Sequence, residues 1–203
     1  MMSCLVVMVR TRCGGGEGDD LIDGGAGDDI LVGDADGQIG GSGGNDILVG
    51  GAGNDTLVGG GGQDTYLFES GDGIDVIVDA GGEGNRLVFG AGISPKDIVA
   101  AVGPNDSLVI RTGFERDEVQ IWNFGTSNLA GSHPIDTFEF SDGTIFTYGQ
   151  LSSAGLSRSG GVGNDHIVGR QTATESMVER VATSFKGRRE LILCLGKMEE
   201  TYC

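Results

Sequence analysis

A nine-residue repeat runs through the first part of the chain, with glycine at the first, second and fourth places and aspartate at the sixth. The segment 50–58 reads Gly-Gly-Ala-Gly-Asn-Asp-Thr-Leu-Val and fills every one of these places. Copies start at residues 15, 24, 41, 50, 59 and 70, and an isolated copy starts at residue 160. A short, fixed period is typical of a solenoid, in which each unit stacks on its neighbours. The repeat therefore restricts the fold more than any other feature of the sequence.

Disorder is the main alternative for a chain of this composition. Glycine makes up 40 of the 203 residues, and 30 acidic against 13 basic residues give a net charge of −17. These figures are typical of an acidic linker, but such a linker has no reason to keep a period. Collagen is excluded, because the chain has only 3 prolines and its glycines do not recur at every third residue. The acidic balance also argues against a nucleic-acid or anionic-membrane partner, because both require a basic face.

Each place in the repeat has a physical role. The glycines allow positive φ and close backbone approach, so the first six residues can form a tight turn. The last three residues are apolar and favour a very short strand, whose middle side chain points inward. The predicted inward side chains are those of Ile22, Leu31, Leu48, Leu57 and Tyr66. Two repeats then form one coil, so the turns along one edge come from repeats n and n+2.

The sixth-place aspartates of one edge are expected to lie one strand spacing apart, about 4.8 Å. Carboxylates at this separation repel one another unless a divalent cation lies between them. Aspartate oxygens and the backbone carbonyls of the glycine turns suit a hard cation, and Ca²⁺ accepts irregularly placed oxygens better than Mg²⁺ does. His166 is the one histidine in these repeats and they contain no cysteine, which argues against zinc or copper.

The repeat resembles the RTX (repeats-in-toxin) calcium-binding repeat, most fully at 24–32 and 50–58. The resemblance implies a right-handed parallel β-roll that binds several calcium ions as its cofactors. The implied metal ligands are Asp20, Asp29, Asp46, Asp55, Asp64 and Asp75, together with the fourth-place glycines Gly27, Gly44, Gly53 and Gly62. The n and n+2 rule predicts the complete pairs Asp29/Asp46, Asp46/Asp64 and Asp55/Asp75, and it leaves Asp20 in a half-filled site.

Three segments depart from the pattern. The segment 33–40 is one residue short and has Gln38 where aspartate is expected. Two residues, Phe68 and Glu69, are inserted before the last consecutive copy. At 81–89 the glycines persist but Arg86 replaces the aspartate, so we expect no calcium there and a roll that ends near Val78.

After residue 78 glycine becomes rarer and alternating runs predict short strands at 86–89, 108–110, 119–122, 137–140 and 145–148. The segments 89–98, 119–124 and 138–144 resemble the haemolysin-type calcium-binding-related domain that often follows RTX repeats. The expected fold is therefore all-β, a parallel β-roll at 14–78 followed by a small, mainly antiparallel β domain at 79–158. A short helix is expected at 96–101, after Pro95. The side chains expected in the core of this domain are Trp122, Phe124, Phe138 and Phe140.

The ends of the chain differ from its middle, and all four cysteines lie outside residues 14–169. Residues 1–13 are expected to be disordered, and their apolar run at 5–9 is too short for a signal peptide or a membrane span. Residues 159–169 hold the isolated repeat. The tail at 170–203 loses glycine and turns basic, and its pattern is that of a short helix. It either takes the place of a C-terminal export signal, or it and residues 1–13 are foreign or out of frame, in which case the chain is a fragment of a longer protein.

No set of residues predicts catalysis, so the chain is expected not to be an enzyme. Ser42 lies in a Gly-x-Ser-x-Gly stretch, but it lacks the preceding long strand and the following helix of a hydrolase nucleophile. The histidines His133 and His166 are far apart in the sequence and belong to no zinc-protease motif.

The RTX resemblance also implies a cellular role. It implies a secreted, extracellular bacterial protein, exported by type I secretion machinery, and we expect it to be monomeric. The crowded aspartates should keep the roll unfolded until calcium binds. Two alternatives remain: an accessory part of a larger secreted toxin, protease or lipase, and an element of an adhesin.

Overall fold

The structure is a computed structural model that describes residues 3–5, 12–34, 43–80, 83–114, 116–125, 132–153 and 157–158. All of these residues belong to one compact unit, residues 1–161. The expected isolated repeat at 159–169 and the tail at 170–203 lie outside the described residues. In the part of the chain described, no helix is long and apolar enough to cross a membrane.

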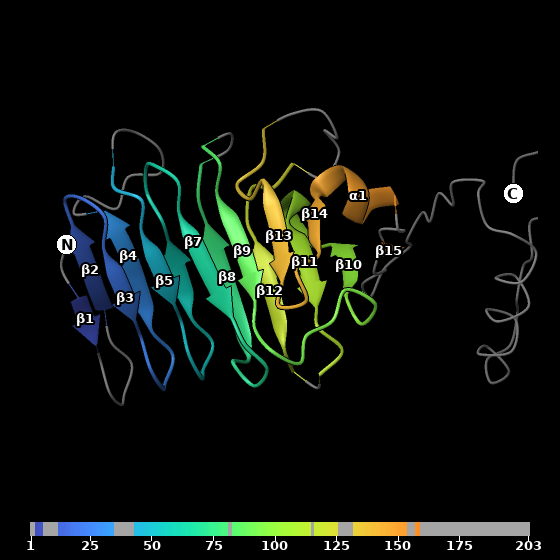
Figure 1. The fold of residues 1–203 in the computed structure, drawn as a ribbon, viewed down its shortest axis with the longest axis horizontal. Helices are drawn as coiled ribbons and strands as arrows, with labels where there is room; N and C mark the ends of the chain where they lie inside the picture. Colours follow the sequence, from blue (N-terminus) through green and yellow to red (C-terminus); the bar gives the residue numbers. More distant parts are fainter. Residues whose placement is uncertain are drawn as a thin grey trace, which may run out of the picture. The chain divides into compact units, whose positions relative to one another are not determined.

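Two β-sheets make up the unit, and their strands stack one after another (Figure 1). The first sheet has the order β1 (Ser3–Leu5), β3 (Leu21–Asp23), β5 (Ile47–Val49), β7 (Thr65–Phe68), β9 (Arg86–Phe89), β13 (Thr137–Phe140) and β14 (Ile145–Thr147). The second has the order β15 (Ser157–Arg158), β10 (Val99–Val102), β11 (Leu108–Arg111), β12 (Glu118–Ile121), β8 (Ile74–Val78), β6 (Thr56–Val58), β4 (Ile30–Asp34) and β2 (Arg12–Gly16). A 3₁₀ turn, η1 (Pro104–Asp106), and one helix, α1 (Tyr148–Ser153), complete the described elements.

Successive strands of the repeat region alternate between the two sheets. Within each sheet the neighbours are parallel and two strands apart in the chain, as in the pairing of β3 with β5 and of β4 with β6. Two repeats therefore form one coil. The predicted all-β fold with a parallel roll is confirmed.

The core of the roll follows the strand period of two. Ile22, Leu31, Leu48, Leu57 and Tyr66 are each at most 1% exposed, which confirms the predicted inward set. Leu21, Ile30 and Ile47, each the residue before an inward one, are 36–42% exposed, because successive side chains of a strand face opposite sides.

The two sheets continue past Val78 without a break. Strand β9 pairs in parallel with β7, and β12 pairs in parallel with β8. The antiparallel pairs are those of β10 with β11, β11 with β12 and β13 with β14. The second region is thus built onto the open edges of the roll, and pairing leaves no unpaired edge between them.

Strands are also present in the N-terminal flank, where disorder was expected. Strand β1 pairs with β3, and β2, which begins at Arg12, pairs with β4. Both strands extend the sheets by one coil toward the N-terminus. The sequence gives little sign of this, because residues 3–5 carry no glycine repeat.

Two predictions for the second region are wrong. Residues 99–102 form strand β10 instead of a helix, because pairing with β11 overrides the weak helix signal of Pro95. The helix of this region is α1, at Tyr148–Ser153. Trp122 is 50% exposed, because it follows the inward-facing Ile121 at the end of β12 and alternation turns it outward. The other aromatic residues expected in the core are buried there: Phe124, Phe138 and Phe140.

Candidate metal centres

The sixth-place aspartates form two rows, one along each edge of the roll where the strands of one sheet lead into the other. In each row the backbone N–H of one aspartate donates a hydrogen bond to Oδ1 of the aspartate on the next coil. The bonds are Asp20 to Asp46 at 2.8 Å, Asp46 to Asp64 at 2.8 Å, Asp29 to Asp55 at 2.7 Å, and Asp55 to Asp75 at 3.0 Å. Each row therefore links coil to coil through one carboxylate oxygen and leaves the other oxygen for a different partner.

These rows correct one predicted pair. Asp29 aligns with Asp55 and not with Asp46, because β4, which follows Asp29, pairs with β6, whereas β5, which follows Asp46, pairs with β3. Asp46 instead has Asp20 as its neighbour, so Asp20 belongs to a pair. The other two predicted pairs, Asp46 with Asp64 and Asp55 with Asp75, lie on neighbouring coils.

The rows are buried, and in four of the six aspartates Oδ2 has no hydrogen-bond partner among the described residues. These four are Asp46, Asp55, Asp64 and Asp75, none more than 1% exposed. A buried charged oxygen without a partner costs several kcal/mol in a dry interior, on the order of the penalty for an uncompensated ion. Each such oxygen therefore requires a cation or a proton.

Burial dominates the electrostatics of these carboxyl groups. It raises the pKa of Asp46 and Asp55 to about 6, that of Asp64 to about 7 and that of Asp75 to about 8. Hydrogen bonds from backbone amides oppose the shift, and neighbouring carboxylates add to it. Without a cation Asp64 and Asp75 therefore hold protons near neutral pH, and Asp46 and Asp55 do so below about pH 6. A divalent ion that binds these carboxylates would displace the protons.

The fourth-place glycines stack in the same edges. A β-carbon on Gly53 would overlap the carbonyl oxygen of Gly27, and one on Gly62 would overlap that of Gly44. The carbonyl oxygens of Gly27 and Gly44 thus lie in the narrow gap between successive turns. Only glycine fits this spacing, and the gap brings the predicted carbonyl and aspartate ligands to the same edges of the roll.

The composition of these edges selects among metals. Within the described ranges, no three aspartate, glutamate, histidine or cysteine side chains come together as a metal-binding group. A cation between the turns would therefore take one or two carboxylates and complete its shell with backbone carbonyl oxygens. Such an irregular set of oxygens fits Ca²⁺, and it does not fit the nitrogen and sulfur preference of zinc.

Asn85 ends the first row, which is the row of Asp20, Asp46 and Asp64. This residue was not identified from the sequence. The N–H of Asp64 donates to Oδ1 of Asn85 at 2.8 Å, so Asn85 occupies the aspartate register. Arg86, which the repeat spacing predicts at that place, is the first residue of β9 and pairs with Thr65. The Asn85 amide donates to the carbonyl oxygens of Ala80 and Pro134. The sequence signal was an asparagine one place earlier than the repeat spacing requires.

A second, exposed ladder accompanies each buried row. At the fifth place of the repeat, the N–H of Asn45 donates to Oδ1 of Asp19 at 2.8 Å, and the N–H of Asn54 donates to Oδ1 of Asp28 at 3.0 Å. The N–H of Gln63 continues the first ladder to Asn45. Sequence reasoning treated this place as variable, because aspartate, asparagine and glutamine alternate in it. What its residues share is mostly a side-chain oxygen that holds neighbouring turns in register.

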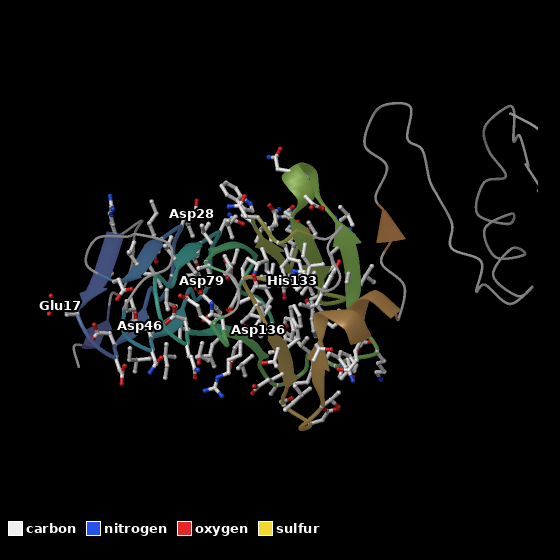
Figure 2. All side chains as sticks on the ribbon, turned by 90° about the horizontal axis from the view of Figure 1, so that it is seen from above. Glu17, Asp28, Asp46, Asp79, His133 and Asp136 are labelled. Atoms are coloured by element: carbon white, nitrogen blue, oxygen red, sulfur yellow. The ribbon has the colours of Figure 1, made fainter. Side chains whose placement is uncertain are left out.

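Of the residues weighed for catalysis, the described part of the chain contains His133. Ser42 and His166 lie outside the described residues. His133 is buried against the rings of Phe124 and Tyr148, and its Nδ1–H donates to the carbonyl oxygen of Phe124 at 2.8 Å (Figure 2). Its position is that of a core side chain of the second region.

Comparison with protein families gives two matches. Residues 15–37 and 40–77 match the RTX calcium-binding nonapeptide repeat, in four copies. Residues 98–150 match the haemolysin-type calcium binding protein related domain. A search of curated proteins finds no match to the chain. The first match contains all six sixth-place aspartates of both rows.

Proposed function

Because the chain belongs to the RTX calcium-binding repeat proteins and its repeats bind several calcium ions, we propose that calcium is the signal that folds it. The observation that carries this proposal is the pair of buried aspartate rows, in which four Oδ2 atoms have no hydrogen-bond partner among the described residues. A fold that buries such oxygens requires a cation or a proton at each of them, and calcium is the proposed occupant.

The proposed ligands follow from the two edges of the roll. Calcium ions lie between successive turns and bind sixth-place carboxylates together with carbonyl oxygens of Gly27, Gly44, Gly53 and Gly62. The buried Oδ2 atoms of Asp46 and Asp55 and the position of the glycine carbonyls in the gaps support this assignment. Each ion then joins two coils that are neighbours in space and about two repeats apart in the chain.

Without calcium the folded roll is opposed by two effects. The aspartates of a row lie on neighbouring coils and repel one another when ionised. The turns are rich in glycine, and glycine loses more backbone entropy on folding than any other residue type. The calcium-free repeats are therefore proposed to remain an extended coil.

With calcium the balance reverses by mass action. An ion that binds the folded form alone stabilises it by RT ln(1 + [Ca²⁺]/Kd), which is about 1.4 kcal/mol per site at ten times Kd. Asp46 hydrogen-bonds with both Asp20 and Asp64, so ions along a row share ligands and favour one another. The folding transition should accordingly be steep in calcium concentration.

This behaviour fits a protein that is exported before it folds. In a calcium-poor cytoplasm the chain stays extended, and at about 10⁻³ M calcium outside the cell, sites of the extracellular class with Kd of about 10⁻⁴–10⁻³ M fill. We place the chain in the extracellular space of a bacterium, as a monomer that type I secretion machinery exports. Its role is calcium binding and folding without catalysis, either by itself or as the accessory part of a larger secreted protein.

Circular dichroism of the full chain tests the proposal. The far-ultraviolet spectrum should be that of a coil in chelator and that of a β-rich protein after calcium is added, with magnesium as the control ion. A spectrum that chelator and calcium leave unchanged contradicts calcium-triggered folding.

A further inference from the structure

The first row of aspartates ends beside a buried carboxylate that the repeat pattern does not contain. Val58 and Val78 are partners in the pairing of β6 with β8, and Val32 and Val58 are partners in that of β4 with β6. The residue that follows each of these valines is Gly33, Gly59 or Asp79. Asp79 therefore stands where the two preceding coils have glycine. It is nonetheless buried, at 4% exposed (Figure 2).

Three side-chain oxygens converge beside Gly59. A β-carbon on Gly59 would overlap Oδ2 of Asp64, the hydroxyl of Tyr66 and Oδ2 of Asp79 at the same time. The Tyr66 hydroxyl donates to Oδ2 of Asp79 at 2.5 Å. Tyr66 is part of the packed core of the roll, so this hydrogen bond fixes the Asp79 carboxylate toward Asp64.

An unpartnered buried group points into this cluster. Asp64 is 0% exposed, and its Oδ2 has no hydrogen-bond partner in the part of the chain that the structure describes. The Oε2 atom of Glu83, four residues after Asp79, is also inaccessible and has no hydrogen-bond partner among the described residues. The charges that act on Asp79 from nearby are those of further carboxylates, Glu83 and Asp34. The cluster thus concentrates negative charge at a place where an oxygen still lacks a partner.

Asn85 cannot supply the second negative ligand at this end of the row. Its Oδ1 accepts from the N–H of Asp64, and its Nδ2 donates to two carbonyl oxygens. The repeat pattern would take that ligand from a sixth-place aspartate on the next coil. Here the nearest alternative carboxylate belongs to Asp79, which approaches Asp64 from the start of the turn.

We propose that Asp64 and Asp79 hold a further calcium ion at the end of the first row, with Tyr66 as a positioning residue. The inference rests on the proposed function, because it takes calcium as the ion that fills the gaps between turns. It goes beyond that function by adding a ligand from outside the nonapeptide pattern. It also replaces the expectation that the turn after Val78 contributes to no calcium site.

The number of calcium ions bound by the full chain tests this site. Equilibrium dialysis should give one ion fewer for Asp79→Asn than for the wild type. Asp28→Asn is the matched control: it removes one carboxylate charge on the exposed ladder and keeps the Oδ1 acceptor for Asn54, so it should retain every ion. Equal numbers and affinities for the wild type and Asp79→Asn would overturn the proposal and would indicate a proton in place of the ion.

Two further variants protect the test against loss of folding. Asp79→Gly introduces the glycine that the two preceding coils have at this position, as Gly33 and Gly59. This variant should also bind one ion fewer. Tyr66→Phe keeps both carboxylates, so it should retain the number of ions and weaken one of them by about tenfold. If Tyr66→Phe leaves every affinity unchanged, Tyr66 has no positioning role.

The outcome also separates this site from the proposed function. A wild-type chain whose folding does not respond to calcium contradicts the proposed function. A wild-type chain that folds with calcium, while Asp79→Asn and Asp79→Gly bind the full number of ions, contradicts the terminal site alone.

Discussion

The backbone N–H of Asp46 donates to Oδ1 of Asp64 at 2.8 Å, across one full coil of the roll. The same bond recurs from Asp20 to Asp46, so one aspartate serves as donor to the next coil and as acceptor from the previous one. Each buried carboxylate therefore has one oxygen committed to the backbone and one directed to another partner. This division of the two oxygens is the structural basis of the calcium sites proposed above.

The position of an aspartate in its row should decide how much its loss affects folding. Asp46 has a neighbour on each side, whereas Asp20 is the first of the three aspartates in its row. Asp46→Asn keeps the hydrogen-bond acceptor but removes charge from two proposed sites, and Asp20→Asn removes charge from one. Calcium titrations followed by circular dichroism should give a higher midpoint for Asp46→Asn than for Asp20→Asn. Equal midpoints would contradict the shared-ligand arrangement.

Acid should favour the calcium-free roll. Burial raises the pKa values of Asp46, Asp55, Asp64 and Asp75 from 3.8 to between about 6 and about 8. Between pH 3.8 and about pH 8 the folded form therefore holds more protons than the unfolded form. Stability then falls as pH rises through this window, because stability rises with pH only where the unfolded state binds more protons. In chelator, the β-signal should increase as the pH is lowered from about 8 toward 5.

Calcium affinity should change with pH in the opposite sense. Protons and calcium compete for the same carboxylates, so the calcium midpoint should rise as the pH falls below about 7. A midpoint that is constant from pH 8 to pH 5, or a calcium-free β-signal that weakens on acidification, would contradict the assignment of these buried carboxyl groups.

The narrow gap between turns predicts a steric effect at Gly53. A β-carbon there would overlap the carbonyl oxygen of Gly27, so Gly53→Ala must push two coils apart. We expect a loss of about 1–3 kcal/mol in the calcium-bound state, as for other overpacked sites. Gly14→Ala is the control, because the nearest atom to its β-carbon would be 3.8 Å away. Thermal unfolding of the two variants in saturating calcium should separate them, and similar transition temperatures would contradict the close stacking.

The sequence predicts the roll well because the repeat encodes it locally. Glycine turns and three-residue strands set the coil, and the inward set from Ile22 to Tyr66 follows from alternation alone. The family matches agree with the RTX resemblance and with calcium as the metal. The strands expected at 86–89, 108–110, 119–122 and 137–140 are also present, with end shifts of one residue at most.

The errors arise where spacing is irregular or where distant strands decide. Nothing in the segment 33–40 shows whether it adds a coil, so the partner of Asp29 was assigned one repeat out of register. Asn85 lies one place from the expected register, and its role depends on Pro134, which is far away in the sequence. Strand β10 forms because β11 pairs with it, and a local helix signal cannot contain that information.

Amide hydrogen exchange of the two rows tests the central claim most directly. The N–H groups of Asp20, Asp29, Asp46 and Asp55 form the coil-to-coil bonds that exist only in the folded roll. With saturating calcium these amides should be strongly protected, and in chelator at neutral pH they should exchange at the rate of an unfolded chain. Equal protection with calcium and with chelator would contradict calcium-triggered folding of the roll.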